Sequence, residues 1–129
     1  MTRAIGGDLL QQGDDAPMEI NRVELEGRLS GTPETRSLPS GDELTTFRIV
    51  VRRPPGARVP SVDAIDCVVW ARGLARRVQS WEPHSRVTVE GSLRRRFWRG
   101  ASGVSSRTEV EVERARLVRR VGAAERMRN

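Results

Sequence analysis

Arginine and aromatic residues gather in residues 91–100, which read Gly-Ser-Leu-Arg-Arg-Arg-Phe-Trp-Arg-Gly. The preceding residues 86–90 alternate like a β-strand, whose successive side chains point to opposite faces. Continued through the stretch, this alternation puts Arg94, Arg96 and Trp98 on one face. Guanidinium planes beside an indole form a platform on which unpaired nucleic-acid bases stack. A basic, solvated strand with Trp98 packed against a loop is the alternative interpretation of the same pattern.

The charge of this 129-residue chain is strongly uneven. Residues 1–45 carry 4 arginines and 9 acidic residues, net −5, whereas residues 46–129 carry 19 arginines and 8 acidic residues, net +11. All 23 basic residues are arginine, which is consistent with a bias toward GC-rich codons. Arginine nevertheless stacks on bases and forks onto phosphates where lysine offers a point charge. A basic pole of this size predicts a polyanionic partner.

The residue inventory excludes several kinds of chemistry. Without lysine the chain can form neither a Walker A phosphate loop nor a Schiff base. One histidine, His84, and one cysteine, Cys67, do not readily supply an ordinary zinc site or a Ser-His or Cys-His pair. We therefore predict a protein that is not an enzyme and uses no metal or cofactor. The absence of a long apolar run or signal core predicts a cytoplasmic protein without membrane contact.

Alternating apolar residues predict five strands, at about residues 19–30, 44–53, 62–71, 86–98 and 108–118. Between the third and fourth strands, Leu74, Ala75, Val78 and Trp81 follow helical spacing, and Pro83 ends the helix. We expect Trp81 to anchor the core. Residues 31–34 and 38–41 are predicted turns, and residues 53–60 and 99–106 are predicted loops. This order predicts an all-β chain with the OB-fold, a five-stranded, partly open Greek-key barrel with one helix between strands three and four.

The predicted OB-fold domain covers residues 18–120, between a flexible arm at 1–17 and a short basic tail at 121–129. Strands two and three form the face on which OB-folds bind oligonucleotides. The predicted DNA-binding residues lie on the outward side of the strands and in the arginine-rich stretch: Arg22, Arg48, Arg52, Trp70, Arg94, Arg96, Trp98 and Arg99. The opposite face of the fourth strand is expected to pack on the core through its apolar residues: Val87, Val89, Leu93 and Phe97.

Several short motifs, each weak alone, follow the order and nearly the spacing of one family over residues 19–118. They are Asn21–Leu29, Pro33–Arg36, Pro39–Gly41, Thr46–Val51, Ile65–Trp70, Leu74–Ala75, Val89–Leu93, Arg96–Trp98 and Thr108–Val110. Through them the chain resembles the bacterial single-stranded-DNA-binding protein family. The resemblance implies a nucleoid-associated protein that coats single-stranded DNA in replication, recombination or repair. It also implies self-association, as a homotetramer.

The resemblance carries over to individual residues. Trp98 and Trp70 stand where the family has stacking aromatics in its fourth and third strands. Ala64 stands where the family usually has an aromatic, and the prolines at 54 and 55 lie near another family tryptophan. Two stacking positions are thus absent, and affinity is expected to depend more on arginine. Residues 122–129 differ from the acidic, apolar tip through which typical members recruit enzymes, so no tail-mediated protein partners are expected.

Two other functions remain open from the sequence. The first is a protein-interaction module, a diverged OB-fold of the primosomal-protein type. Ala64 and the missing acidic tail favour it, and the arginine-rich fourth strand opposes it. The second is a nuclease built on the barrel, which would need clustered carboxylates to hold a metal. Asp63 and Asp66 are near in sequence, but strand alternation sends them to opposite faces. The leading prediction is sequence-tolerant binding of single strands.

Overall fold

The computed structural model describes residues 18–56 and 61–120, so the predicted arm at 1–17 and tail at 121–129 lie outside the described residues. The described elements follow each other in the predicted order of three strands, a helix and two strands. They are β1 (Val23–Ser37), β2 (Glu43–Arg52), β3 (Val62–Val69), α2 (Arg72–Gln79), β4 (Arg86–Gly100) and β5 (Gly103–Arg119). In the described part of the chain, no helix is long and apolar enough to cross a membrane.

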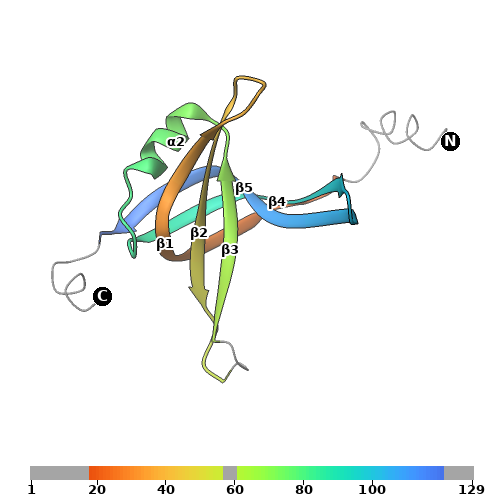
Figure 1. The fold of residues 1–129 in the computed structure, drawn as a ribbon. Helices are drawn as coiled ribbons and strands as arrows, with labels where there is room; N and C mark the ends of the chain where they lie inside the picture. Colours follow the sequence, from red (N-terminus) through yellow and green to blue (C-terminus); the bar gives the residue numbers. More distant parts are fainter. Residues whose placement is uncertain (1–17, 57–60, 121–129) are drawn as a thin grey trace.

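The five strands form a barrel in the order β1-β2-β3-β5-β4, with β4 returning to β1 (Figure 1). Neighbouring strands are antiparallel except β3 and β5, which run parallel. The β3–β5 seam is short, with only Cys67 opposite Val110 and Val68 opposite Glu111 in register. The predicted OB-fold is confirmed; the barrel is closed, where a partly open one was expected, and β3–β5 is its shortest seam.

β1 is longer and lies further along the chain than predicted. It begins at Val23 and continues to Ser37, through the residues 31–34 that were expected to form a turn. The register to β2 shifts between Ser30 and Glu34, and Gly31 has a φ of 79°. This irregularity bends the strand without ending it. The first half of β1 therefore pairs with β4, and the second half with β2.

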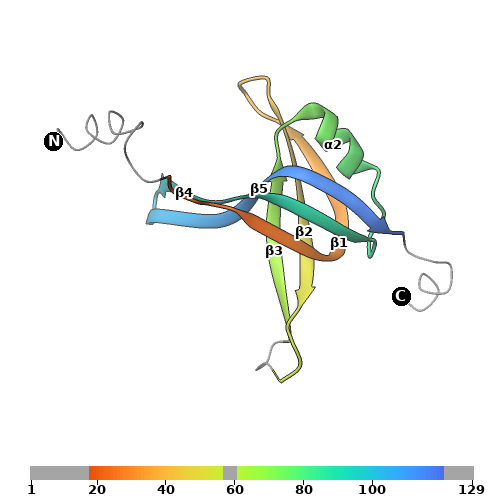
Figure 2. The same ribbon diagram turned by 180° about the vertical axis from the view of Figure 1, so that it is seen from behind.

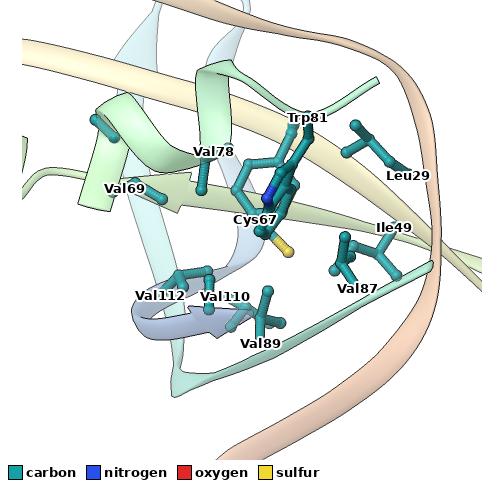
Figure 3. Close-up of a cluster of buried hydrophobic side chains, with 13 residues drawn as sticks. Leu29, Ile49, Cys67, Val69, Val78, Trp81, Val87, Val89, Val110 and Val112 are labelled. Atoms are coloured by element: carbon teal, nitrogen blue, oxygen red, sulfur yellow. The ribbon is translucent and has the colours of Figure 1, made fainter. Parts of the chain in front are cut away.

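The core lies inside the barrel and under α2, as Figure 3 shows. Inward residues of each strand alternate with outward ones, which is the period-2 pattern expected from the sequence. α2 closes one end of the barrel through Ala75 and Val78. Trp81 is 5% exposed and meets Phe47 edge-on, with ring centroids 5.8 Å apart. The prediction that Trp81 anchors the core is confirmed.

The outer parts of β4 and β5 leave the barrel as a two-stranded projection (Figures 1 and 2), which we call the β4–β5 hairpin (residues 93–110). The expectation that Leu93 and Phe97 pack on the core is wrong, because they are 49% and 63% exposed. The barrel ends near Gly91, so the inward side of β4 has no core beyond that residue. At Gly91 the strands approach so closely that a Cβ atom would collide with the Glu111 carbonyl.

Candidate nucleic-acid interface

The outward face of β2 and β3 presents polar and basic side chains to solvent. Arg48 and Arg52 extend from this side of β2, where Arg48 lies opposite Asp66 and Arg52 opposite Val62. Trp70 follows the last residue of β3 and is 40% exposed. Arg52 and Trp70 therefore lie at opposite ends of the β2–β3 ladder, and Arg48 lies between them.

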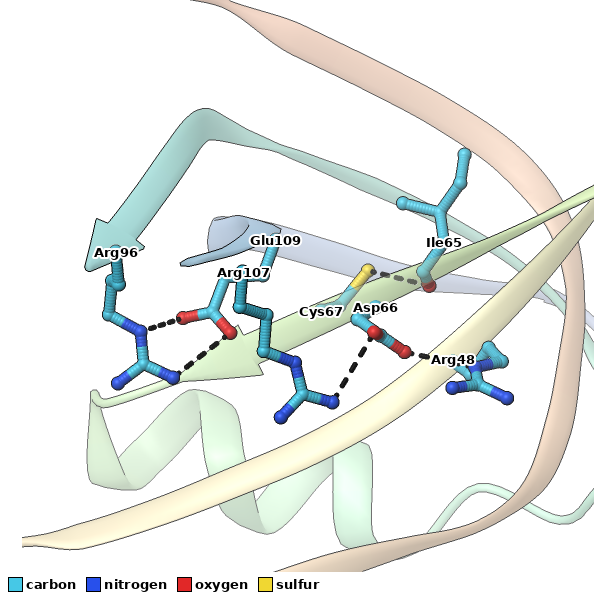
Figure 4. A network of polar contacts seen from close by, with 7 residues as sticks. All are labelled: Arg48, Ile65, Asp66, Cys67, Arg96, Arg107 and Glu109. Atoms are coloured by element: carbon cyan, nitrogen blue, oxygen red, sulfur yellow. Dashed lines mark hydrogen bonds and ion pairs between the residues drawn. The ribbon is translucent and has the colours of Figure 1, made fainter. Parts of the chain in front are cut away.

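Asp66 joins two strands across the closing seam of the barrel. Arg48 donates from Nε to Asp66 Oδ1 at 2.9 Å, and Arg107 of β5 donates from Nη2 to Asp66 Oδ2 at 3.4 Å (Figure 4). Both arginine side chains are about half exposed. Each guanidinium has five N–H donors, so both keep donors that point to solvent. Asp66 thus positions two cations and leaves them able to bind a further anion.

Two further ion pairs hold arginines of the β4–β5 hairpin. Arg96 Nε lies 3.0 Å from Glu109 Oε2, and its Nη2 donates to Glu109 Oε1 at 3.2 Å. The Glu109 side chain is only 5% exposed, whereas that of Arg96 is 50% exposed. Arg94 donates from Nε to Glu111 Oε1 at 3.1 Å. The two contacts of Arg96 form a fork that fixes the plane of its guanidinium, whereas Arg94 is held by a single hydrogen bond.

A groove of about 770 Å³ lies among these side chains. Its walls come from the second half of β1, from β2 and β3, and from the base of the β4–β5 hairpin. This is the side of an OB-fold that takes oligonucleotides. Its charged lining consists of four arginines and three carboxylates: Arg36, Arg48, Arg96, Arg107, Glu34, Asp66 and Glu109. The groove therefore has an excess of one positive charge, less than its arginines alone would give.

The other predicted residues lie around the groove and do not line it. Trp98 shares the hairpin face of Arg94 and Arg96, further toward the tip, and is 50% exposed. Arg99 points to the other face, near the tip. Arg22 is exposed just before β1; its neighbour Asn21 makes two 2.8 Å hydrogen bonds with the Leu93 backbone, which places Arg22 beside the hairpin base.

Sequence reasoning missed Arg36 and Arg107 as residues of the groove. Arg36 lies in the part of β1 that was predicted to follow a turn. Arg107 lies beside the stretch treated as a loop, although the structure begins β5 at Gly103. The alternation of Arg107, Glu109 and Glu111 was a usable signal, because it is the period of one strand face.

The remaining reactive residues are engaged in structural contacts. Cys67 is fully buried, and burial raises the pKa of its thiol to about 12. Asp63 binds Arg53 at 2.7 Å, and hydrogen bonding from Arg53 lowers the pKa of the Asp63 carboxyl. Asp63 and Asp66 lie on opposite faces of β3 and therefore bind different arginines. Within residues 18–56 and 61–120, no three His, Cys, Asp or Glu residues gather in a way that could hold a metal ion.

Comparison with known proteins gives consistent matches. The sequence model of the "Single-strand binding protein family" matches residues 20–118. Single-stranded DNA-binding protein A of Bacillus subtilis is 34% identical over 99 residues, which is 73% of this chain and 56% of that protein. The single-stranded DNA-binding protein of Lactiplantibacillus plantarum is 33% identical over 112 residues, 83% of this chain and 55% of that protein. The chain thus spans about half the length of these relatives.

A solved structure shares the fold. It is described as "Plasmodium falciparum SSB complex with ssDNA" and superposes with a TM-score of 0.63 at 24% sequence identity. The superposition covers 81% of this chain and 97% of that chain.

Proposed function

We propose that this chain, which belongs to the single-strand binding protein family, binds single-stranded DNA without catalysing a reaction. In this proposal it coats strands exposed during replication, recombination or repair, in the cytoplasm at the nucleoid. The observation that carries the proposal is the continuous outward surface from Arg48 across the seam to Arg96 and Trp98. That surface lies where OB-folds take oligonucleotides. The names of the relatives are consistent with this ligand.

The chemistry of the surface suits unpaired bases better than a duplex. Trp98 and Trp70 offer exposed π-faces, on which any base can stack. The arginines offer phosphate contacts that carry no sequence information. Reading a duplex requires an element that enters a groove and contacts base edges. The face of β2 and β3 is not such an element, and on the projecting hairpin Arg94 and Arg96 are each held by a glutamate. We therefore expect strong preference for single strands and little base specificity.

Self-association is the second part of the proposal. We expect a homo-oligomer, a tetramer, assembled partly through first strands. Residues 23–27 of β1 pair with β4, and the register to β2 begins only at Arg28. In the described residues this stretch of β1 thus has one backbone edge without a strand partner. The charges of Glu24 and Glu26 would disfavour close approach of two first strands. The charge of Glu26 is balanced by Arg86 at 2.7 Å.

A protein-interaction module of the primosomal type is the alternative. Two observations favour it: the groove is nearly balanced in charge, and exposed Ala64 replaces an aromatic on β3. Such a module would contact proteins through the same barrel and bind single strands weakly.

A gel-shift titration separates these functions. The protein is titrated against oligo-dT and a matched duplex, with and without magnesium, at physiological salt. The proposal predicts a shift of oligo-dT at concentrations well below those needed for the duplex, and no strand cleavage with magnesium. Equal affinity for both ligands, or no binding of oligo-dT, would reject single-strand binding. Light scattering of the same sample would reject self-association if it gave a single 14.4 kDa species.

A further inference from the structure

The β4–β5 hairpin has a second face, of which the predicted binding site uses only Arg99. Cross-strand pairing places Leu93 opposite Val110, Phe97 opposite Ser106 and Arg99 opposite Val104. We call this the reverse face; its outer residues are Leu93, Arg95, Phe97, Arg99, Val104, Ser106 and Thr108. It points away from the face that carries Arg96 and Trp98, because successive residues alternate.

Three large apolar side chains are exposed on the reverse face. Leu93 is 49% exposed, Phe97 63% and Val104 63%. The Arg95 guanidinium lies over the Phe97 ring, with its central carbon 5.1 Å from the ring centroid. An arginine over an aromatic ring at this distance is a favourable cation–π arrangement. Phe97 and Arg95 therefore form a pair in which the cationic group lies over one face of the aromatic ring.

The charge of the reverse face differs from that of the groove. Among the described residues that share it, none is acidic, whereas Arg95 and Arg99 are basic. Arg95 donates to the neutral Ser106 Oγ at 3.4 Å. On the other face, Arg94 and Arg96 are each paired with a glutamate. Among the residues that the structure describes, no carboxylate on the reverse face offsets the charge of these cations.

We infer that the reverse face is a second contact surface for single-stranded DNA, on which Phe97 stacks on a base and Arg95 and Arg99 bind phosphates. A ligand that matches it must be anionic and carry flat apolar groups, which describes a single strand. A strand leaving the groove past Trp98 would turn around the hairpin to reach Phe97. This inference rests on the proposed function, because it extends the same ligand beyond the groove.

The test compares two substitutions of Phe97, one that removes the aromatic ring and one that keeps it. Phe97→Leu keeps apolar bulk without a π-face, and Phe97→Tyr keeps the ring. Each is titrated by fluorescence anisotropy against oligo-dT of about 8 and about 30 nucleotides, the shorter within the range of one OB-fold site. Trp98→Ala is the reference for the groove side. Light scattering of each variant reports oligomeric state.

The inference predicts that Phe97→Leu weakens binding of the longer strand by roughly 5- to 150-fold, the range for loss of one base–aromatic stack. Phe97→Tyr should bind like wild type. The shorter strand should be nearly insensitive to Phe97→Leu but weakened by Trp98→Ala, because it fills only the groove side. Arg95→Ala should reduce the slope of log K against log salt concentration for the longer strand by about 0.7, the value for one lost phosphate contact.

Three outcomes would overturn the inference. If Phe97→Leu binds the longer strand like wild type while Trp98→Ala weakens binding, the proposed function stands and the second surface is rejected. If Phe97 variants lower the oligomeric state without affecting affinity, the reverse face packs against a second copy instead. If wild type fails to bind either oligo-dT, the proposed function fails and the inference fails with it.

Discussion

Glu109→Gln should separate two effects of the carboxylate that holds Arg96. The carboxylate stabilises the fold, and it repels the phosphates of a bound strand. Glutamine keeps the shape of the side chain but removes its charge, so the paired contacts at 3.0 and 3.2 Å lose most of their electrostatic strength. Hydrogen bonds to charged groups contribute about 1.5–3 kcal/mol to stability. Because Arg96 is 50% exposed and screened by solvent, we expect a loss near 1 kcal/mol. For a domain of this size that corresponds to a decrease in Tm of roughly 4–8 °C.

The same change should strengthen binding of single strands. A phosphate bound by Arg96 would lie about 6 Å from the Glu109 carboxylate, a repulsion of about 0.7 kcal/mol in water and about 2.8 kcal/mol at an effective dielectric of 20. The groove is open to solvent, so we expect a gain near 1 kcal/mol, or about fivefold in Kd. Release of Arg96 should also increase the slope of log K against log salt concentration by up to about 0.7.

The measurements are thermal unfolding and anisotropy titration with oligo-dT at several salt concentrations. Glu113→Gln is the matched control, because it removes the same charge from an exposed position of β5 outside the groove lining. Glu109→Gln should tighten binding more than the control does. If it weakens binding while the control is neutral, Glu109 serves to hold Arg96 in its binding geometry, and the electrostatic reasoning is refuted.

Trp98→Ala should weaken oligo-dT binding by about 1–3 kcal/mol and leave Tm nearly unchanged, because the indole is half exposed; binding should quench wild-type tryptophan fluorescence, and a large fall in Tm would argue against this role. Ala64→Trp should tighten binding in the same titration by adding a stacking surface to β3. Gly91→Ala should cost about 1–3 kcal/mol or more in urea unfolding, because its Cβ would meet the Glu111 carbonyl. The free energy of unfolding should fall by about 1.4 kcal/mol per pH unit between pH 9 and 12, because in that range the Cys67 thiol ionises only in the unfolded chain. Cys67→Ala should abolish this pH dependence.

Much of the fold could be predicted because strand alternation and helical spacing are local properties of the sequence. Val87 and Val89 face inward and Trp81 packs under the helix, as their spacing indicates. The exposure of Leu93 and Phe97 could not be predicted in this way. Alternation shows which side of a strand a residue takes, but only the length of the neighbouring strands shows where the core ends.

Two of the four groove arginines, Arg48 and Arg96, were predictable from the sequence, and the carboxylates that hold them were less so. The outward position of Arg48 and Arg96 follows from alternation along single strands. Their pairing with Asp66 and Glu109 depends on contacts between strands that are distant in sequence, and those depend on barrel register. The near-balance of charge in the groove is therefore a property of the closed barrel.

The shortness of the β3–β5 seam has a consequence for how the chain folds. β1, β2 and β3 form a meander of neighbouring antiparallel strands, and β4 and β5 form a hairpin along the whole of β4. Both units need only short loops to close, whereas joining them requires long-range contacts with a larger entropy cost. We expect the two units to form early and the barrel to close late. Successive amides of a strand point to opposite neighbours, so one of the amides of Cys67 and Val68 faces β5. That amide should exchange with solvent by opening of the seam alone, at lower free energy than global unfolding.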